Sequence, residues 1–353
     1  VFACSEALSG ESGSTGLLLQ QNMWEVVPLL GYGIVEQQGT QNPEEDETTC
    51  RTLTTEDLIS EELLLPQPEE TQQTALIPES VEATAGTALS NFRPAVQQVQ
   101  IDRTQLADYE TLVRNFYAID ANTMAGSDQL SVEKLLGMDM TLPQEGDGPQ
   151  ILIYHTHSQE GFVDSVPGDN STTIMGAGEY LSELLREKGF EVMHVTSVYD
   201  LIDGELDRSE AYSRAEEEIS QILAEHPSIQ SVIDLHRDGV AEGTRLVTEL
   251  NGKTMARFMF FNGLSRTRKN GPIEYLHNPY IEDNLALTLQ LKLTCDQYYP
   301  GLARNIYLKS LRYNLHLSPK ALLIEAGAQT NTLQEILNTM EPLADLLDKV
   351  FGT

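Results

Sequence analysis

The chain has 353 residues, with 54 Asp and Glu against 22 Lys and Arg. Its formal net charge of -32 argues against a nucleic-acid partner, because a phosphate backbone needs a basic surface, and against a polybasic contact with anionic lipid. Hydrophobic residues make up 40% of the sequence, so a sizeable core is available. The three cysteines, Cys4, Cys50 and Cys295, have no short spacing and form neither a zinc knuckle nor a disulfide framework.

The net negative charge is denser near the N-terminus, because basic residues are few there. Residues 1–100 hold 16 acidic and two basic side chains, and from about residue 36 to residue 98 Gln, Glu, Thr and Pro dominate. A segment so poor in apolar residues cannot bury enough surface to offset the entropy lost on ordering. We therefore expect an acidic, mostly disordered region over residues 1–98, a helical lead-in over 99–145 and the main folded domain over 146–353.

Strands and helices alternate after residue 150. In the lead-in, helical spacing of apolar residues predicts helices over residues 109–117 and 132–136. The strands expected in the main domain cover residues 151–154, 190–195, 229–235, 303–308 and 321–324. The helices expected there cover residues 178–188, 209–224, 278–299 and 332–350.

Two extended runs between residues 244 and 261 flank Asn251-Gly252, which is a strong hairpin signal. Elsewhere, the alternation of strand and helix predicts an α/β fold, with a mainly parallel twisted sheet and helices on both of its faces.

A cluster of potential metal ligands follows the first expected strand. His155, His157 and Glu160 fall within six residues directly after the apolar run 151–154. Residues two apart on a strand point to the same face, so both histidines could look into one site. Imidazole nitrogen and carboxylate oxygen are ligands that zinc takes. The alternative is that one histidine is a hydrogen-bonded residue at the edge of the sheet.

Two further strands end in groups of the same kind. His236 follows the strand over residues 229–235, and Glu325 follows the strand over residues 321–324. In open α/β sheets ligands gather at the carboxyl ends of strands, so these side chains should meet the first cluster at one edge. Two histidines, one or two carboxylates and a position left for water make a catalytic zinc site. A carboxylate at a buried strand end, such as Glu325, is costly unless it is paired or ligated.

The neighbours of His236 allow other interpretations. His236 itself could be a hydrogen-bonded residue beside Asp234. Arg237 and Asp238 could form a structural ion pair, which is the interpretation we favour. Alternatively, Arg237 holds a carboxylate of the substrate, for which its planar fork is suited.

Three motifs, in the same order along the chain, resemble those of stage II sporulation protein P, a family of peptidoglycan hydrolases of endospore-forming bacteria. They lie at residues 151–160, 234–238 and 322–327, and Asn331 accompanies the third. The resemblance covers roughly residues 130–353. It implies a zinc amidase-like domain over residues 146–353, similar to zinc-dependent N-acetylmuramoyl-L-alanine amidases.

The resemblance also implies ligands. In the wider amidase group the first zinc histidine ends the first strand, and His157 fits that place better than His155. His236 matches the second zinc histidine. The group's third ligand is a glutamate whose place here, near residues 170–172, holds Asn-Ser-Thr. Glu160 is therefore the expected third ligand, with His155 as the second choice.

Further roles follow from the same resemblance. Glu325, with Asn331 after it, matches the catalytic glutamate of the group. His155, Arg237 and Asn331 are expected to bind substrate or to support the ligands.

The implied reaction is hydrolysis of the amide that joins the lactyl group of muramic acid to L-alanine of the stem peptide, with Zn2+ as cofactor and Glu325 as general base. The family is also associated with an endopeptidase cut within the stem peptide, and the motifs do not choose between the two. The implied partners are peptidoglycan and the stage II sporulation proteins D and M during engulfment. The implied location is extracytoplasmic, with a membrane anchor before Val1. The alternative is a non-catalytic, acidic cell-wall binding module of the same fold.

Overall fold

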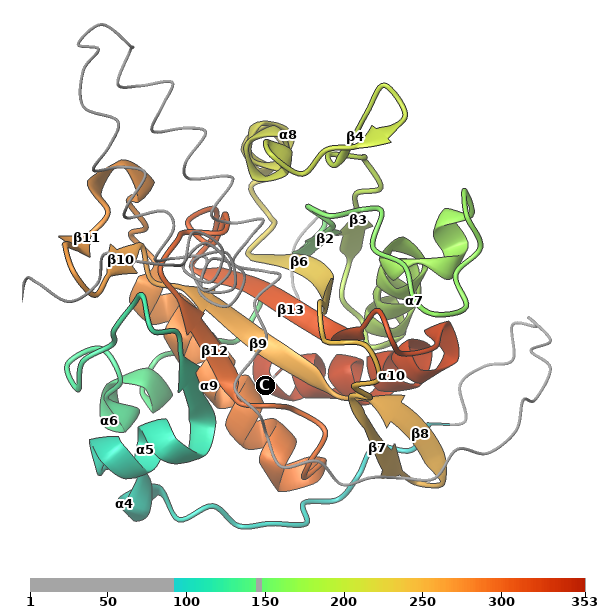
Figure 1. Cartoon of the computed structure of the whole chain (residues 1–353). Coiled ribbons are helices and arrows are strands. Elements are labelled where there is room, and N and C mark those ends of the chain that lie inside the picture. Colours follow the sequence, from blue (N-terminus) through green and yellow to red (C-terminus); the bar gives the residue numbers. More distant parts are fainter. Residues whose placement is uncertain (1–91, 144–147, 353) are drawn as a thin grey trace, which may run out of the picture. The chain divides into compact units, whose positions relative to one another are not determined.

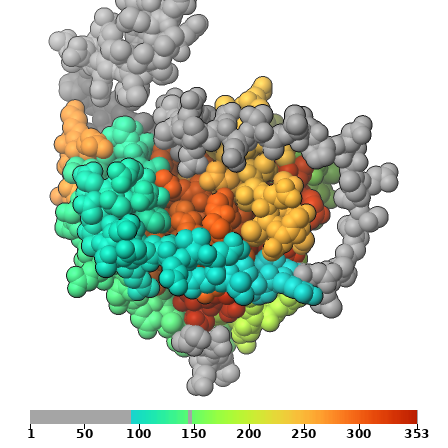
Figure 2. All heavy atoms as spheres, turned by 90° about the horizontal axis from the view of Figure 1, so that it is seen from below, coloured from blue at the N-terminus to red at the C-terminus, as the bar shows by residue number. Residues whose placement is uncertain are grey.

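The computed structural model describes residues 92–143 and 148–352. Most of the acidic region expected to be disordered, up to residue 91, therefore lies outside the described residues. Residues 92–98 form no helix or strand, and the backbone N–H of Gln98 donates to the carbonyl of Gln297 (2.8 Å). Figure 2 shows this first described segment, in cyan, lying across the part of the chain coloured orange. The boundaries of the three regions remain predictions.

A seven-stranded sheet forms the centre of the described fold (Figure 1). Its strands, in spatial order, are β1 (Tyr117–Ile119), β12 (Ile306–Lys309), β9 (Phe258–Gly263), β13 (Lys320–Ala328), β6 (Ser231–Asp238), β2 (Ile151–Tyr154) and β3 (Val192–His194). Five of the six neighbouring pairs in this sheet are parallel, and β9 runs antiparallel to β13. The predicted mainly parallel α/β sheet is confirmed.

Helices cover both faces of the sheet, as predicted. The helices α7 (Ile174–Glu187), α9 (Ile281–Tyr298) and α10 (Leu333–Phe351) lie on one face, and α8 (Ala211–Glu225) lies on the other (Figure 1). Strand alternation decides which side chains meet which helices. Ile151 and Ile153 of β2 belong to the same core cluster as the buried residues of α7, whereas Leu152 and Tyr154 pack with those of α8.

The lead-in helices pack beside the sheet domain. The two that were predicted are α5 (Tyr109–Phe116) and α6 (Val132–Leu136), and the short helix α4 (Arg103–Leu106) was not predicted. The side-chain amide of Gln290, on α9, donates to the backbone carbonyls of Leu135 and Met138, both at 2.9 Å. These bonds join α6 and the turn after it to α9.

One central strand was not predicted. Residues 244–261 were expected to form two hairpin arms, but the second arm breaks near Arg257. The hairpin consists of β7 (Val247–Leu250) and β8 (Lys253–Ala256), and β9 then enters the central sheet. Asn251 and Gly252 both have positive φ angles, 53° and 74°, as a two-residue hairpin turn requires. The strand β1 was also missed, because three residues are too few to show a pattern.

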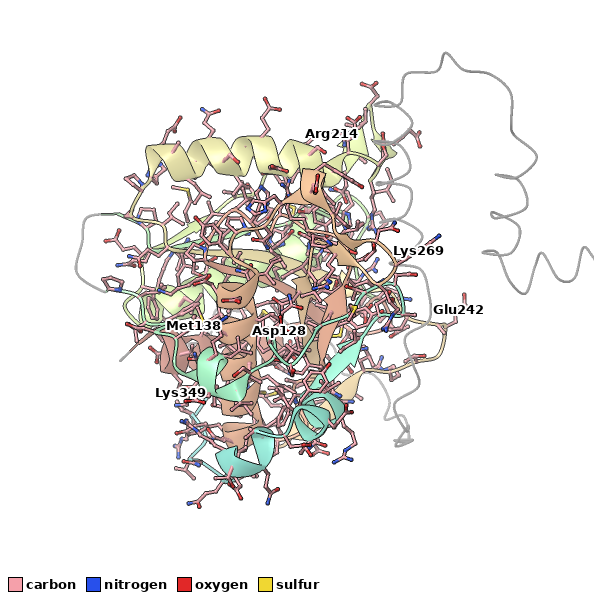
Figure 3. All side chains as sticks on the ribbon, turned by 90° about the vertical axis from the view of Figure 1, so that its left-hand side faces the viewer. Asp128, Met138, Arg214, Glu242, Lys269 and Lys349 are labelled. Carbon is pink, nitrogen blue, oxygen red and sulfur yellow. The ribbon has the colours of Figure 1, made fainter. Side chains whose placement is uncertain are left out.

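Shorter elements complete the described chain. They are the hairpins β4 (Leu201–Ile202) with β5 (Glu205–Leu206) and β10 (Arg266–Thr267) with β11 (Gly271–Pro272), and the 3-10 turns η1 (Asn170–Thr172) and η2 (Glu274–Leu276). Exposed charged side chains such as Glu242 and Lys269 project from the loops (Figure 3). None of the helices in the described ranges is long and apolar enough to span a membrane.

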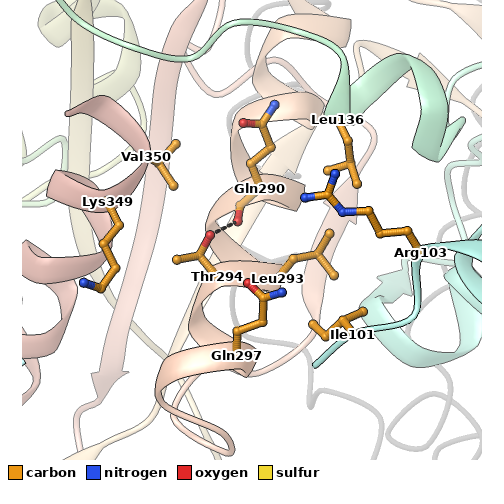
Figure 4. A pocket seen from close by; sticks show the side chains of 9 residues that line it. All are labelled: Ile101, Arg103, Leu136, Gln290, Leu293, Thr294, Gln297, Lys349 and Val350. Carbon is orange, nitrogen blue, oxygen red and sulfur yellow. Dashed lines mark hydrogen bonds between the residues drawn. The ribbon is translucent and has the colours of Figure 1, made fainter. Parts of the chain in front are cut away.

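A cavity of about 180 Å³ lies beside α9 (Figure 4). It is lined by Ile101, Arg103, Leu136, Gln290, Leu293, Thr294, Gln297, Lys349 and Val350. None of the residues predicted to act in the site belongs to this lining.

The last central strand is irregular just after Glu325. The register of β13 against β6 shifts between Glu325 and Ala328, and Gly327 lies within this irregularity with a φ of 65°. A Cβ atom on Gly327 would lie 2.6 Å from the Ile336 side chain and 2.8 Å from that of Ala256. Glycine is therefore required both by the backbone angle and by the close approach of α10.

We expect Gly327→Ala to lower the free energy of unfolding by about 2–4 kcal/mol, because it adds overpacking to the cost of a left-handed backbone. Gly168→Ala is the matched control, since Gly168 has a φ of 81° but nothing within 4 Å of a Cβ atom. That control should cost only about 1–2 kcal/mol. Urea unfolding would compare the two, and equal losses would contradict the close packing at Gly327.

Candidate metal centre

Three buried side chains meet at the carboxyl ends of β2 and β6. His157, Glu160 and His236 each offer one ligand atom, and these atoms all lie within 4.8 Å of one another. His157 Nδ1 lies 3.5 Å from Glu160 Oε1, and His236 Nδ1 lies 3.6 Å from Glu160 Oε2. The fold thus brings together the three residues that the sequence indicated as ligands.

The spacing of these atoms suits a metal ion. Ligand atoms that each lie ~2.0–2.2 Å from a tetrahedral zinc ion are ~3.3–3.6 Å apart, which matches the distance of each histidine from one of the two Glu160 oxygens. His157 Nδ1 is buried without a hydrogen-bond partner among the described residues. A buried polar atom normally has a partner, so this nitrogen is suited to bind an ion.

Alternation along β6 positions the second histidine. Asp234 and His236 are two residues apart, so both point to the face covered by α8. There the Tyr212 ring, from α8, stacks on His236 with centroids 6.4 Å apart and an interplanar angle of 15°. The same ring meets His157 edge-on at 5.5 Å. Tyr212 therefore restrains both imidazoles from one side.

Asp234 connects the turn after β2 to His236. Its carboxylate accepts hydrogen bonds from the backbone N–H of Thr156 (2.9 Å) and the Thr156 hydroxyl (2.6 Å). Its Oδ1 atom, which accepts from the Thr156 N–H, also lies 2.8 Å from Nε2 of His236. Asp234 therefore leaves Nδ1 of His236 turned toward Glu160.

Asp200 holds the same turn from a different loop. Its carboxylate accepts from the Ser158 hydroxyl (2.6 Å) and from the backbone N–H of Gln159 (3.2 Å). The backbone N–H of Arg237 in turn donates to Glu160 Oε2 (2.9 Å). Sequence reasoning missed Asp200, because no local pattern distinguishes it and only the folded chain brings it to the site.

Glu325 lies beside His236 in the neighbouring strand. The two residues are direct partners in the pairing of β13 with β6. Glu325 is buried, and its Oε2 atom has no hydrogen-bond partner in the described part of the chain. Burial raises the pKa of Glu325 to about 8, helped by the nearby charges of Asp238 and Glu160 and opposed by His236. A carboxyl group in this state can exchange a proton near neutral pH.

His155 does not share the site with His157. The strand β2 ends at Tyr154 and the chain then turns, so the two-residue rule fails between the two histidines. His155 Nδ1 lies 2.8 Å from the carbonyl of Leu235, and Nε2 lies 2.9 Å from Nε2 of His194. Both ring nitrogens are thus occupied, and neither is free for a metal.

The helix α7 leaves room for this second pair of histidines. A Cβ atom on Gly178 would lie 2.5 Å from Nε2 of His155, so a larger residue there would displace the ring. His194 also contacts Glu179 of α7, with Nδ1 2.7 Å from Oε2. His155 therefore ties β2, β3, β6 and α7 together behind the site.

The ion pair favoured for Arg237 and Asp238 does not form. Asp238 pairs instead with Arg304, at 2.6 Å between Oδ2 and Nη1. The Arg237 side chain donates to the backbone carbonyls of Gly161 (3.2 Å) and Asp238 (3.2 Å). Neighbours on a strand point to opposite faces, which is why these two side chains do not meet.

Asn331 lies next to the site but is used by the backbone around it. Its Oδ1 accepts from the N–H of Ala328 (2.9 Å), and its Nδ2 donates to Glu335 Oε2 (2.9 Å). Glu335 also completes a capping box with Thr332 at the start of α10. Asn331 therefore fixes the loop that follows Glu325 to the first turn of α10.

A proton on His236 offsets part of the negative charge of the site. Burial alone would lower the pKa of His236, but the Asp234 and Glu160 carboxylates raise it well above its ordinary value. Burial lowers the pKa of His157. Burial would raise the pKa of Glu160, but its contacts with His157 and His236 lower it well below its usual range. The carboxylates of Asp234 and Glu160 thus surround one imidazolium. Their remaining negative charge favours the binding of a cation.

The family of the chain follows from comparison with known sequences. A family model described as Stage II sporulation protein P matches residues 48–348. The chain belongs to this family. The resemblance carried by the three motifs is thereby confirmed.

One curated relative is the Stage II sporulation protein P of Bacillus subtilis (strain 168). It is 24% identical over 221 residues, which cover 58% of this chain and 52% of that protein. The chain therefore spans about half the length of the curated relative that it matches.

Two solved structures show a distant likeness. One is the N-acetylmuramoyl-L-alanine amidase from Clostridium difficile 630, with a TM-score of 0.37, 13% identity, and coverage of 58% of this chain and 95% of that chain. The other is the N-acetylmuramyl-L-alanine amidase from Mycobacterium smegmatis, with a TM-score of 0.31, 12% identity, and coverage of 58% and 100%. A likeness this distant carries no argument about the activity of the chain.

The raised pKa of Glu325 predicts how the stability of the metal-free protein depends on pH. Between pH 4.5, the ordinary value, and about pH 8, the folded state keeps a proton that the unfolded state releases. The free energy of unfolding should therefore fall as pH rises through this window. In Glu325→Gln this contribution is absent. The difference in the free energy of unfolding between the wild type and Glu325→Gln should change by at most about 1.4 kcal/mol per pH unit.

Denaturant unfolding at several pH values between 5 and 8 would measure this difference. Glu183→Gln, on the exposed face of α7, is the control and should follow the wild type at every pH. Parallel curves for wild type and Glu325→Gln would show that Glu325 does not hold a proton in this range.

Proposed function

We propose that this protein is a zinc-dependent peptidoglycan hydrolase that cleaves the amide between the lactyl group of muramic acid and L-alanine of the stem peptide during sporulation engulfment. The observation that carries the proposal is the convergence of His157, Glu160 and His236 at one point, with the buried Glu325 in the next strand. Membership of the stage II sporulation protein P family supports the same conclusion.

The number of ligands favours an enzyme over a binding module with a structural ion. Structural zinc sites are normally closed by four protein ligands, whereas catalytic sites have three and leave a place for water. Among the described residues, the group able to hold a metal has three members. A fourth position would then be open to water or to a substrate carbonyl.

The residues of the site have separate parts in the proposed reaction. A zinc ion held by His157, Glu160 and His236 would polarise the scissile carbonyl and lower the pKa of a water molecule. Glu325 would accept a proton from the attacking water and deliver it to the leaving nitrogen, so that water is added across the broken C–N bond. Asp234 would keep His236 in the orientation that the ligand needs.

Several finer points remain predictions. They are the endopeptidase cut within the stem peptide, the association with stage II sporulation proteins D and M, and the extracytoplasmic, membrane-anchored location. The reaction at the muramoyl amide can be tested without them.

We expect His236→Ala to lose stoichiometric zinc, because it removes one of three ligands and leaves Glu160 and Asp234 without their shared partner. Metal analysis of dialysed protein by mass spectrometry would measure this. His277→Ala is the control, since His277 is an exposed histidine outside the site. Zinc retained at one equivalent in His236→Ala would place the metal elsewhere.

We expect Glu325→Gln to keep its zinc and its fold while turnover falls by a factor on the order of 100–10,000, the usual contribution of acid–base catalysis. The substitution keeps the shape of the side chain and removes its ability to take a proton. Release of stem peptides from purified sacculi, followed by mass spectrometry, would measure turnover, and products beginning at L-alanine identify the amidase cut.

Two outcomes would contradict these assignments. If Glu325→Gln loses its metal, then Glu325 is a ligand. If zinc-loaded wild-type protein releases nothing from sacculi, alone or with its sporulation partners, the binding-module alternative is correct.

A further inference from the structure

Arg208 lies beside the candidate metal centre and is not among its candidate ligands. The residue follows the hairpin β4–β5 and precedes α8. Its Nη2 atom is 3.7 Å from Glu160 Oε1, and its Nε atom is 4.0 Å from Asp200 Oδ2. The side chain is 26% exposed, against 4% for Glu160, so the guanidinium lies between the ligand and the solvent.

The hydrogen-bond donors of Arg208 are not used. A guanidinium carries five N–H donors, and those of the nearby Arg214, Arg237 and Arg304 each make hydrogen bonds to the protein. Arg208 makes none within the described residues, and its Nε is buried without an acceptor. Both of its ion-pair distances are too long for hydrogen bonds. A buried donor without a partner is uncommon in folded proteins, which indicates that the partner arrives with a ligand.

The two carboxylates near Arg208 are already supplied with donors. Glu160 accepts from the backbone of Arg237, and Asp200 accepts from Ser158 and Gln159. A cation bound by Glu160 would weaken the attraction of that carboxylate for Arg208 further. Neither group accepts a hydrogen bond from the guanidinium, so its fork remains available to a third carboxylate.

The chain on the N-terminal side of Arg208 exposes apolar side chains. Leu201, Ile202 and Leu206, on β4 and β5, are 39%, 38% and 58% exposed. A ligand held here would thus meet a cationic fork close to an apolar hairpin. An acidic peptide with small alkyl side chains has this combination of groups.

Building on the proposed function, we propose that Arg208 binds a carboxylate of the stem peptide next to the scissile amide, and so selects substrates whose acidic residue after L-alanine is free over those in which it is amidated. Arg208 would be a specificity-determining residue. It would touch the substrate and leave the metal and the proton transfer to the other residues.

The test is a binding measurement that does not depend on turnover. The protein is the zinc-loaded full chain carrying Glu325→Gln, so that the ligand is not consumed. The probes are N-acetylmuramoyl-L-alanyl-D-isoglutamate with its γ-carboxyl capped as an N-methylamide, as the next stem residue caps it, and the same compound with its α-carboxylate also amidated, compared by calorimetry. We expect the acid to bind on the order of tenfold more tightly than the amide, as for a hydrogen bond to a charged group.

Substitution of Arg208 in the same background gives the second arm. Arg208→Met should bind both probes equally, at the affinity of the amide. Arg208→Lys keeps the charge but loses the fork, so it should retain part of the preference. Lys269→Gln removes a positive charge from the exposed turn between β10 and β11 and should leave the preference unchanged.

The outcomes separate this inference from the proposed function. Equal binding of acid and amide to the parent protein, or no binding of either, would overturn the role of Arg208 even if sacculi are hydrolysed. Loss of zinc from both Arg208 variants would overturn it too, since Arg208 would then be a structural counter-ion. A preference for the acid that disappears in Arg208→Met supports the inference, even if the wild-type protein releases no peptides.

Discussion

The candidate metal centre depends on the buried carboxylate of Asp234. This group accepts hydrogen bonds from the backbone N–H and the hydroxyl of Thr156, and its Oδ1 atom also lies 2.8 Å from Nε2 of His236. It therefore connects the turn that carries two ligands to the strand that carries the third. Because a buried carboxylate without partners is costly, the turn and the histidine stabilise Asp234 as much as it positions them.

Charge imposes a second constraint on the site. Glu160, Asp234 and Glu325 are buried close to two imidazoles, and so many carboxylates cannot all be ionised without a compensating cation. In the metal-free protein the compensation comes from a proton on His236 and a proton on Glu325. A divalent cation would replace both, so metal binding should be coupled to proton release. A net charge of -32 over the chain adds to the attraction of the molecule for cations.

Much of the fold was predictable because its signals are local. The apolar run at β2 and the amphipathic spacing of α10 were enough to place those elements, and Asn251-Gly252 was enough to place the hairpin turn. The strand β9 was missed for a physical reason. Its apolar residues continue directly from β8, and only the pairing with β13 and β12 distinguishes a central strand from a hairpin arm.

The sequence by itself determined which kinds of side chain end the central strands, and hence that His157, His236 and Glu325 come together. Tertiary structure decided between the two histidines after β2. Strand parity directs His155 toward α7, whereas the turn directs His157 toward α8, and no local pattern shows where a strand gives way to a turn. The tertiary structure also decided which residues surround the ligands, above all Asp200 and Arg208. These residues reach the site through long-range contacts, and such contacts leave no periodic trace in the sequence that encodes them.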